Sequence, residues 1–240
     1  MTESDLYTKG RGFPLDHISP SFISKYEQCP LAALYYREGR PRQWDPRYAE
    51  VGRYTHSVIE KMYSPDADIH EPECGWDDEM RNRHAGAMAG YRELLKQDSR
   101  FRPVVDGTGA EQLPELHIEI EIQGVPLMGF IDLLTVRGSM IYIDDWKTGM
   151  YKAADEQQLR IYTRMVSQIR GVQPRDITAT LCYLRNEPHK IQRRVSYTGT
   201  AAIDHHIIHD VIEPICDLQF APNRGKGCQR CEYRHICEAW

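Results

Sequence analysis

The feature that most constrains the fold is a strict alternation of polar and apolar residues that begins near position 115. Glu115, His117, Glu119 and Glu121 alternate with Leu116, Ile118, Ile120 and Ile122. A period of two is the signature of a strand with one buried face. Two turn sequences follow, Gln123-Gly124 and Arg137-Gly138-Ser139, and each favours a reversal of the chain. We therefore expect three consecutive strands, at about 116–122, 125–136 and 140–146.

Segments with helical character surround these strands. Ser19-Pro20 is typical of a helix start, and the helix it opens is expected to end near Gly39. Pro30 lies inside that helix, so two shorter helices are an open alternative. Residues 1–18 resemble an irregular lead-in. Further elements are predicted by periodicity: helices at about 47–63, 77–97, 153–170 and 199–219, and strands at about 176–185 and 190–196.

This order of elements predicts an α/β fold with a mixed central β-sheet flanked by helices. We expect one domain over residues 1–240, with a helical N-terminal part at 17–110, a core at 111–197, and a C-terminal helix and Cys-rich tail at 198–240. A chain of 240 residues is long enough to bury a sizeable core in one domain.

Composition narrows the class of protein. Hydrophobic residues make up 41% and charged residues 27% of the chain, as in ordinary globular proteins. No stretch approaches the length of apolar sequence that spans a membrane, and the N-terminal segment lacks the apolar core of a secretory signal. We therefore expect a cytoplasmic protein. The net charge of −5 argues against a generally basic nucleic-acid coat protein, although basic patches at 37–53 and 223–235 would suffice for phosphate contacts.

Acidic residues and one lysine gather at the end of the predicted hairpin 125–146. A two-residue turn at Gly138-Ser139 would place Asp132 opposite Asp145, with Cβ atoms about 4.5–5.5 Å apart. Asp145 and Lys147 then share a face, and Asp144 points to the other. Paired carboxylates favour Mg²⁺ or Mn²⁺, and metal-assisted phosphodiester hydrolysis is the chemistry that fits. From these residues alone, a surface hairpin with one cross-strand ion pair is the more ordinary interpretation.

Four motifs in order resemble the PD-(D/E)xK nuclease superfamily, and its RecB-like branch best. The motifs are Gly52-Arg53-Tyr54-Thr55-His56, Gly129-Phe130-Ile131-Asp132, Asp145-Trp146-Lys147 and Gln158-Leu159-Arg160-Ile161-Tyr162.

The resemblance implies that His56, Asp132, Asp145 and the backbone carbonyl of Trp146 bind Mg²⁺ or Mn²⁺, and that Lys147 is the catalytic lysine. It also implies that Gln158 and Tyr162, one helical turn apart, lie beside the site and contact DNA or the scissile phosphate. One of Glu115, Glu119 or Glu121 is expected to assist, and the sequence does not choose among them.

The seven cysteines form an odd set without a secretory signal, which disfavours a disulfide framework. Cys228, Cys231 and Cys237 follow a C-x₂-C-x₅-C pattern, one ligand short of the four thiolates of a closed site. Two of the other cysteines, Cys182 and Cys216, lie in apolar patterns and are predicted to be buried. A further one, Cys74, falls in a predicted loop and is a candidate stray thiol.

The iron–sulfur members of the RecB-like branch, among them the AddB nuclease domain and the CRISPR spacer-acquisition nuclease, join one early cysteine to such a trio. The resemblance therefore implies that Cys29, Cys228, Cys231 and Cys237 hold a [4Fe–4S] cluster. A structural Zn²⁺ site on the same four cysteines is the alternative.

The resemblance covers residues 17–238 and implies a DNA exonuclease that acts on single strands or DNA ends, in recombination, repair or phage DNA metabolism. We find no G-x-x-x-x-G-K-[ST] loop, so the chain is not expected to be a motor, and a helicase or recombination protein is an expected partner. Two alternatives stay open: a structure-specific endonuclease of the same superfamily, and a catalytically idle DNA-binding subunit.

Overall fold

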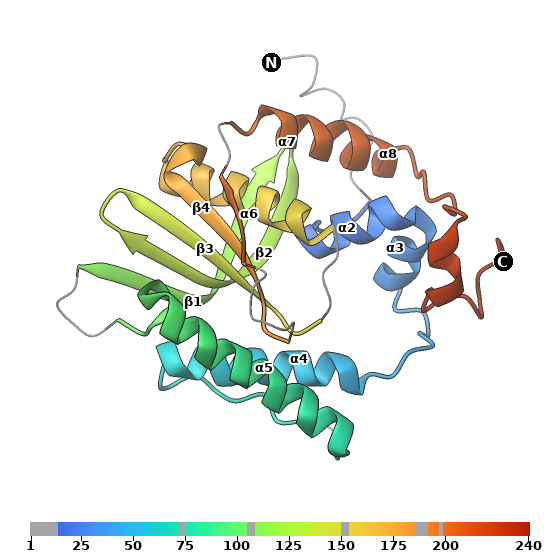
Figure 1. Cartoon of the computed structure of the whole chain (residues 1–240). Helices are drawn as coiled ribbons and strands as arrows, with labels where there is room; N and C mark the ends of the chain where they lie inside the picture. The colour runs from blue at the N-terminus through green and yellow to red at the C-terminus, as the bar shows by residue number, and fades with distance from the viewer. Residues whose placement is uncertain (1–13, 73–74, 105–108, 150–153, 186–191, 197–198) are drawn as a thin grey trace. The chain divides into compact units, whose positions relative to one another are not determined.

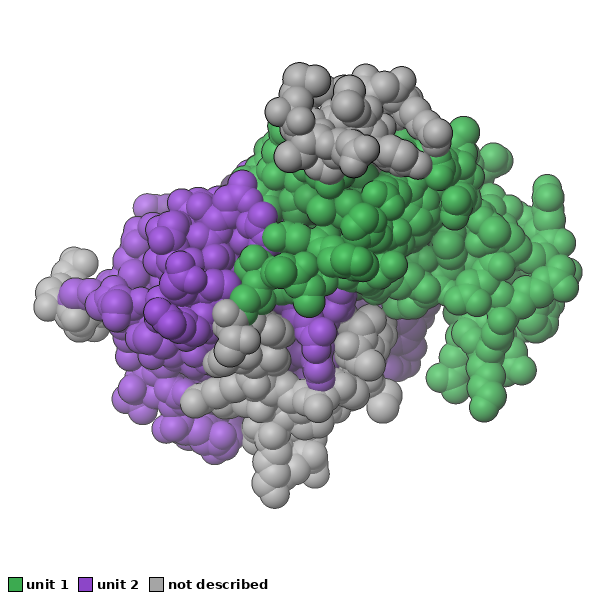
Figure 2. All heavy atoms as spheres, turned by 90° about the horizontal axis from the view of Figure 1, so that it is seen from above, with its two compact units in different colours: residues 1–44, 119–129, 199–240 green, residues 45–118, 130–198 purple. Residues whose placement is uncertain are grey.

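The protein is described here by a computed structural model, which describes residues 14–72, 75–104, 109–149, 154–185, 192–196 and 199–240. The chain divides into two compact units (Figure 2): unit 1 comprises residues 1–44, 119–129 and 199–240, and unit 2 comprises 45–118 and 130–198. Most of the predicted lead-in, the predicted helix start at 153, the predicted strand start at 190 and Cys74 lie outside the described residues. The single-domain organisation stays a prediction.

Five strands form one sheet in sequence order (Figure 1): β1 (Ala110–Ile122), β2 (Val125–Arg137), β3 (Met140–Lys147), β4 (Ile177–Tyr183) and β5 (Gln192–Ser196). β2 and β3 are antiparallel, β3 and β4 are parallel, and β4 and β5 are antiparallel. Helix α6 (Ala154–Arg170) lies between β3 and β4 in the chain, as a parallel pair requires. The mixed sheet flanked by helices is therefore confirmed.

The predicted hairpin register is also confirmed. Arg137 pairs with Met140 across a two-residue turn, and the pairing continues to Leu133 opposite Asp144. Gly138 takes a φ of +59° in this turn, a conformation that glycine adopts without a steric penalty. Beyond the last pair, the Trp146 N–H donates to Asp132 Oδ2 over 2.6 Å, which brings the end of β3 against Asp132.

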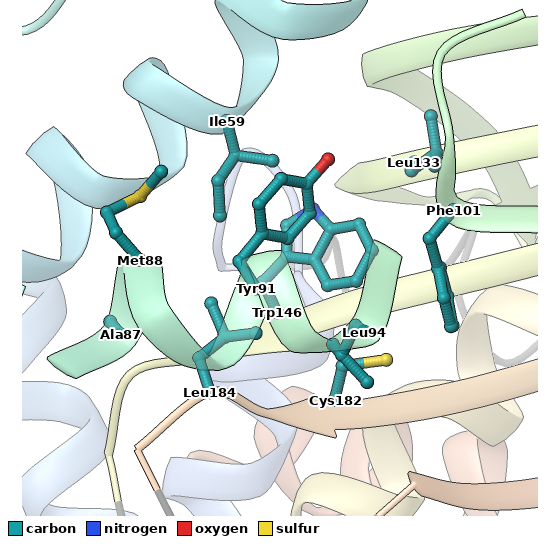
Figure 3. Packing of buried hydrophobic residues seen from close by; sticks show 10 residues of the cluster. All are labelled: Ile59, Ala87, Met88, Tyr91, Leu94, Phe101, Leu133, Trp146, Cys182 and Leu184. Atoms are coloured by element: carbon teal, nitrogen blue, oxygen red, sulfur yellow. The ribbon is translucent and has the colours of Figure 1, made fainter. Parts of the chain in front are cut away.

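One face of β3 packs on the core of unit 2. Helices α4 (Arg47–Tyr63) and α5 (Asp78–Gln97), with the short turn η1 (Ser99–Phe101), supply the other side of this core. The buried ring of Trp146 meets Tyr91 and Phe101 edge-on, with ring centroids 5.5 and 5.6 Å apart, and Ile59 and Leu133 complete its surroundings (Figure 3). Burial of side chains this large stabilises by about 1.5–3 kcal/mol each, so Trp146 fixes which face of β3 points inward.

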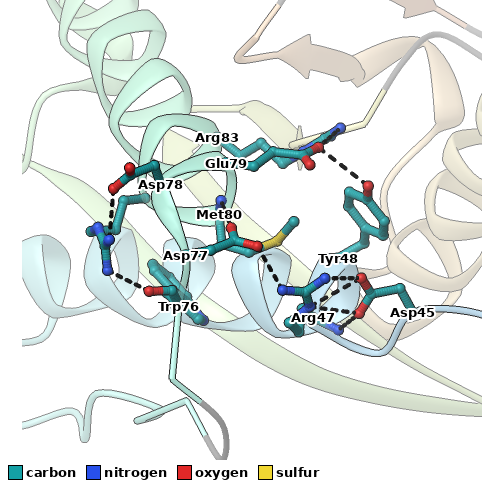
Figure 4. Close-up of polar contacts among 10 residues, drawn as sticks. Asp45, Arg47, Tyr48, Trp76, Asp77, Asp78, Glu79, Met80 and Arg83 are labelled. Atoms are coloured by element: carbon teal, nitrogen blue, oxygen red, sulfur yellow. Dashed lines mark hydrogen bonds and ion pairs between the residues drawn. The ribbon is translucent and has the colours of Figure 1, made fainter.

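A polar network joins the first turns of α4 and α5 (Figure 4). Arg47 Nη1 lies 2.6 Å from Asp77 Oδ2, and Asp77 is the N-cap of α5. One residue along α4, the Tyr48 hydroxyl donates to Glu79 over 3.2 Å. Solvent-exposed pairs contribute little to stability individually. Together with the shared core, they set where α4 presents His56.

Unit 1 contains the helices from both ends of the chain. The predicted first helix is two, α2 (Pro20–Gln28) and α3 (Pro30–Arg37), separated at Cys29 because Pro30 cannot continue α2. The last helix runs through α7 (Ala201–His205), the π-helical η3 (His206–Ile212) and α8 (Glu213–Cys216), and the short η4 (Lys226–Arg230) follows. It ends before the predicted residue 219 because Leu218 adopts a φ of +56°, a left-handed conformation typical of helix ends.

No helix in the described residues is long and apolar enough to cross a membrane.

Candidate active site

Three side chains of unit 2 form a candidate metal-binding group. His56 comes from α4, Glu115 from β1 and Asp132 from β2, and one ligand atom of each lies within 4.8 Å of the others. His56 Nδ1 is 3.3 Å from Asp132 Oδ1 and 3.8 Å from Glu115 Oε1. Carboxylate oxygens suit Mg²⁺ and Mn²⁺, and Mn²⁺ also accepts an imidazole nitrogen. This is the one such group found in the described part of the chain.

The backbone at Glu115 explains how this glutamate joins the group. Its φ is +44°, which non-glycine residues rarely adopt and which costs of the order of 1–3 kcal/mol. The kink turns Glu115 toward His56, while Glu119 and Glu121 remain exposed on the regular part of β1. The sequence left three glutamates open, and the geometry selects Glu115.

The charges of this group compensate one another. Burial disfavours the charged form of His56, but Asp132 and Glu115 outweigh that effect and raise the pKa of His56 to about 10. Burial likewise opposes ionisation of Asp132, yet His56 and Lys147 hold its pKa below its ordinary value. A divalent cation would replace the imidazolium proton as the counter-charge to the two carboxylates, so the donor set fits a metal ion.

Asp145 and Lys147 form a second pair next to this group. Lys147 Nζ lies 2.7 Å from Asp145 Oδ2, and the Asp145 side chain is 3% exposed. Burial raises the pKa of Asp145 against the opposing effect of Lys147. For Lys147 itself, burial lowers the pKa, but Asp145 and Asp132 more than offset it and raise the pKa. Asp145 thus holds Lys147, and metal coordination by Asp145 and by the carbonyl of Trp146 stays a prediction.

Gln158 and Tyr162 connect Lys147 to β2. Lys147 Nζ donates to Gln158 Oε1 over 2.7 Å, and Gln158 Nε2 donates to Tyr162 Oη over 3.1 Å. Tyr162 Oη in turn donates to the backbone carbonyl of Phe130 over 2.5 Å. Both residues lie beside Lys147. In this structure they position Lys147 and β2, and their contact with DNA stays a prediction.

Asp144 faces away from the site, as predicted. Its carboxylate is fully buried, and Arg100 Nη2 lies 3.2 Å from Asp144 Oδ1 and donates to Thr180 Oγ1 over 3.4 Å. Sequence analysis missed Arg100, because an arginine in a short polar segment carries no signal that it will be buried against a strand.

The four predicted cluster ligands gather in unit 1. The backbone N–H groups of Asn223 and Gly225 donate to the sulfurs of Cys29 and Cys228, each over 3.4 Å. Burial raises the pKa of Cys231, and the nearby Cys29, Cys237 and Cys228 raise it further.

The buried positions predicted for Cys182 and Cys216 are confirmed.

The family model of the PD-(D/E)XK nuclease superfamily matches residues 17–238. The chain therefore belongs to this superfamily of nucleases.

One solved structure with a TM-score above 0.5 agrees at the level of the fold. A crystal structure from Eubacterium rectale, provisionally named an exonuclease, has a TM-score of 0.58 at 15% identity and covers 99% of this chain and 93% of its own. The crystal structure named SSO0001 has a TM-score of 0.46 at 17% identity, with coverage of 99% and 93%. The comparison with curated proteins found no match.

Proposed function

We propose that the chain is a Mg²⁺- or Mn²⁺-dependent DNA exonuclease of the RecB-like branch, which acts on single strands or on DNA ends in the cytoplasm. The observation that carries the proposal is the convergence of His56, Glu115 and Asp132 beside the Asp145–Lys147 pair. Recombination, repair and phage DNA metabolism are the settings for such an enzyme, with a helicase or recombination protein supplying strand separation.

The proposed roles follow from position. A bound divalent metal supplies Lewis acidity and lowers the pKa of a coordinated water. His56, Glu115 and Asp132 hold it, with Asp145 and the Trp146 carbonyl as further ligands. Lys147 neutralises charge that develops on the phosphoryl oxygens and orients the nucleophile. Gln158 and Tyr162 keep the lysine in place.

The test is digestion of end-labelled linear DNA and covalently closed circles, single- and double-stranded, with Mg²⁺ or Mn²⁺. We expect cleavage of linear strands from an end, no cleavage in EDTA, and a loss of orders of magnitude in Asp132→Asn and Lys147→Ala. Glu119→Gln, which changes an exposed glutamate of β1, is the matched control. Efficient cutting of circles would favour the endonuclease alternative. Binding without any cleavage would favour the idle DNA-binding subunit.

We further propose that Cys29, Cys228, Cys231 and Cys237 hold a structural [4Fe–4S] cluster. The N–H donors at Cys29 and Cys228 support this assignment, because such donors stabilise thiolate ligands. A structural Zn²⁺ site on the same four cysteines is the alternative, and it calls for the same thiolate ligands.

Metal analysis of anaerobically purified protein tests the cluster. We expect a brown protein with broad absorption near 400 nm and about four irons per chain. One zinc per chain without iron would overturn the cluster and leave the ligand set standing. Retention of iron in Cys29→Ser would overturn the ligand set.

A further inference from the structure

An exposed aromatic ring lies next to the candidate metal group. Phe130 is 57% exposed although its strand neighbours Gly129 and Ile131 are buried. The ring of His117 on β1 lies against it, with centroids 4.9 Å apart and planes tilted by 43°. An exposed ring in the middle of a strand, beside a second aromatic ring, is available for contact with a ligand.

The ring shares its strand face with a proposed ligand. Phe130 precedes Asp132 by two residues on β2, so both side chains point to the same face, with Cα atoms about 6.6–6.8 Å apart. His117 lies against Phe130 from β1. The distance from the aromatic pair to the metal group is therefore about the length of one nucleotide of a bound strand.

The backbone of Phe130 is tied to the proposed catalytic lysine. Its carbonyl accepts from the buried Tyr162, which is linked through Gln158 to Lys147 Nζ. The position of the ring is thus fixed relative to Lys147 by the same hydrogen bonds that orient the lysine.

We propose that Phe130, with His117 beside it, is a stacking surface for an unpaired base of the nucleic-acid strand whose phosphate lies at His56, Glu115 and Asp132. The inference rests on the proposed nuclease function and defines its substrate further. Bases inside a duplex are stacked on both sides, so the surface selects single-stranded segments. Stacking tolerates any base, because every base has an aromatic face. A protein partner fits less well, because His117 and Asp132 beside the ring are ionisable, although Met128 on the same face is apolar.

Binding measured in EDTA tests the surface separately from cleavage. The probes are a fluorescein-labelled oligothymidylate and an abasic strand of the same length and charge, followed by fluorescence anisotropy. We expect wild type to prefer the oligothymidylate. Phe130→Ala should weaken that binding by about 5- to 150-fold, the range for loss of one stacked base, without changing binding to the abasic strand.

Three further variants sharpen the result. Phe130→Trp should keep the preference, and Phe130→Leu, which retains apolar bulk and the fold, should lose it. Ile169→Ala, at an exposed apolar residue of α6, is the matched control and should bind both probes as wild type does.

Two outcomes would overturn the proposal: wild-type affinity for oligothymidylate in Phe130→Ala and Phe130→Leu, or an equal loss of binding to both probes. Digestion of linear DNA by wild type with Mg²⁺ separates the two proposals. Base-dependent binding that Phe130→Ala loses, without any cleavage by wild type, would leave the stacking surface standing and remove the nuclease. Cleavage by wild type, with unchanged oligothymidylate binding in Phe130→Ala and Phe130→Leu, would support the nuclease and remove the stacking surface.

Discussion

Two adjacent aspartates on β3 have different surroundings because side chains of a strand alternate between its two faces. Asp145 points to the site and holds Lys147, and Asp144 points into the core against Arg100. A buried pair contributes little net stability, but removing one partner leaves the other charge buried and uncompensated. Neighbouring residues of the same type therefore carry separable effects on activity and on stability.

We predict that Asp144→Ala lowers the free energy of unfolding by about 3–5 kcal/mol, because it leaves the buried Arg100 with only the more distant carboxylate of Asp98, whose Oδ2 lies 3.9 Å from Arg100 Nε. Asp145→Asn should keep the unfolding midpoint near that of wild type, because Lys147 retains Asp132 as a counter-charge and Gln158 as a hydrogen-bond acceptor. It should abolish metal-dependent cleavage. Urea unfolding in EDTA and a DNA digestion assay measure the two effects. As a control, the double variant Asp144→Leu with Arg100→Met should recover most of the lost stability. A fully stable Asp144→Ala protein would contradict the buried pair.

We predict that Glu115→Gln weakens Mn²⁺ binding by about 10-fold or more, because it removes one anionic ligand from the group. Calorimetric titration of Mn²⁺ without DNA measures the affinity directly. Glu119→Gln makes the same chemical change at an exposed position of β1 and should bind Mn²⁺ as wild type does. Equal losses in the two variants would show that general charge, and not the kinked backbone at Glu115, governs binding.

At the scale of elements, the π-helical segment η3 carries a histidine held between carboxylates. His206 contacts Glu27 of α2, and its Nδ1 lies 2.8 Å from Asp210 Oδ2. The hydrogen bond to Glu27 is the largest of the effects that raise the pKa of His206, and burial opposes it only in part. The contact ties η3 to α2 within unit 1.

The raised pKa of His206 sets the direction of a pH effect. A histidine whose pKa is higher in the folded state stabilises fully below its unfolded pKa of about 6.5. That stabilisation is lost as pH rises through the folded pKa. We predict that His206→Gln costs about 1 kcal/mol of unfolding free energy at pH 6 and less at pH 9. Urea unfolding at both values checks this, with the exposed His209→Gln as control. A cost that grows toward pH 9 would contradict the ion pairs.

At the scale of the whole molecule, two segments far apart in the sequence belong to one compact unit. The described residues 14–44 and 199–240 are both part of unit 1. A cluster on Cys29 and the C-terminal trio would close this long loop, and closure of long loops restricts the unfolded chain most.

We predict that Cys29→Ser lowers the free energy of unfolding by ~4 kcal/mol, the scale of a cross-link across a loop of this kind. Anaerobic urea unfolding and limited proteolysis measure the loss, and the fragments released should come from unit 1. Cys74→Ser is the control and should match wild type. Unchanged stability of Cys29→Ser under anaerobic conditions would argue against a tie between the chain ends.

The sequence by itself determined the order of the elements, the hairpin register and the faces of Asp144 and Asp145. These features follow from local periodicity and from a two-residue turn that leaves only one pairing. It also indicated the nuclease superfamily, because its motifs are short segments of adjacent residues. The order of these motifs along the chain identifies His56, Asp132 and Lys147 as candidate site residues without the tertiary structure.

Only the tertiary structure decided which glutamate joins His56, because a positive φ at Glu115 breaks the alternation that made three glutamates equivalent. It alone placed Arg100 against Asp144, and it alone joined Tyr162 to the carbonyl of Phe130. Each of these contacts links segments that are far apart in the sequence, and sequence separation does not predict the distance between them in the folded protein. Packing around Trp146 sets the distance between Arg100 and Asp144, since Phe101 and β3 are part of that core and a close-packed core admits few arrangements of its elements.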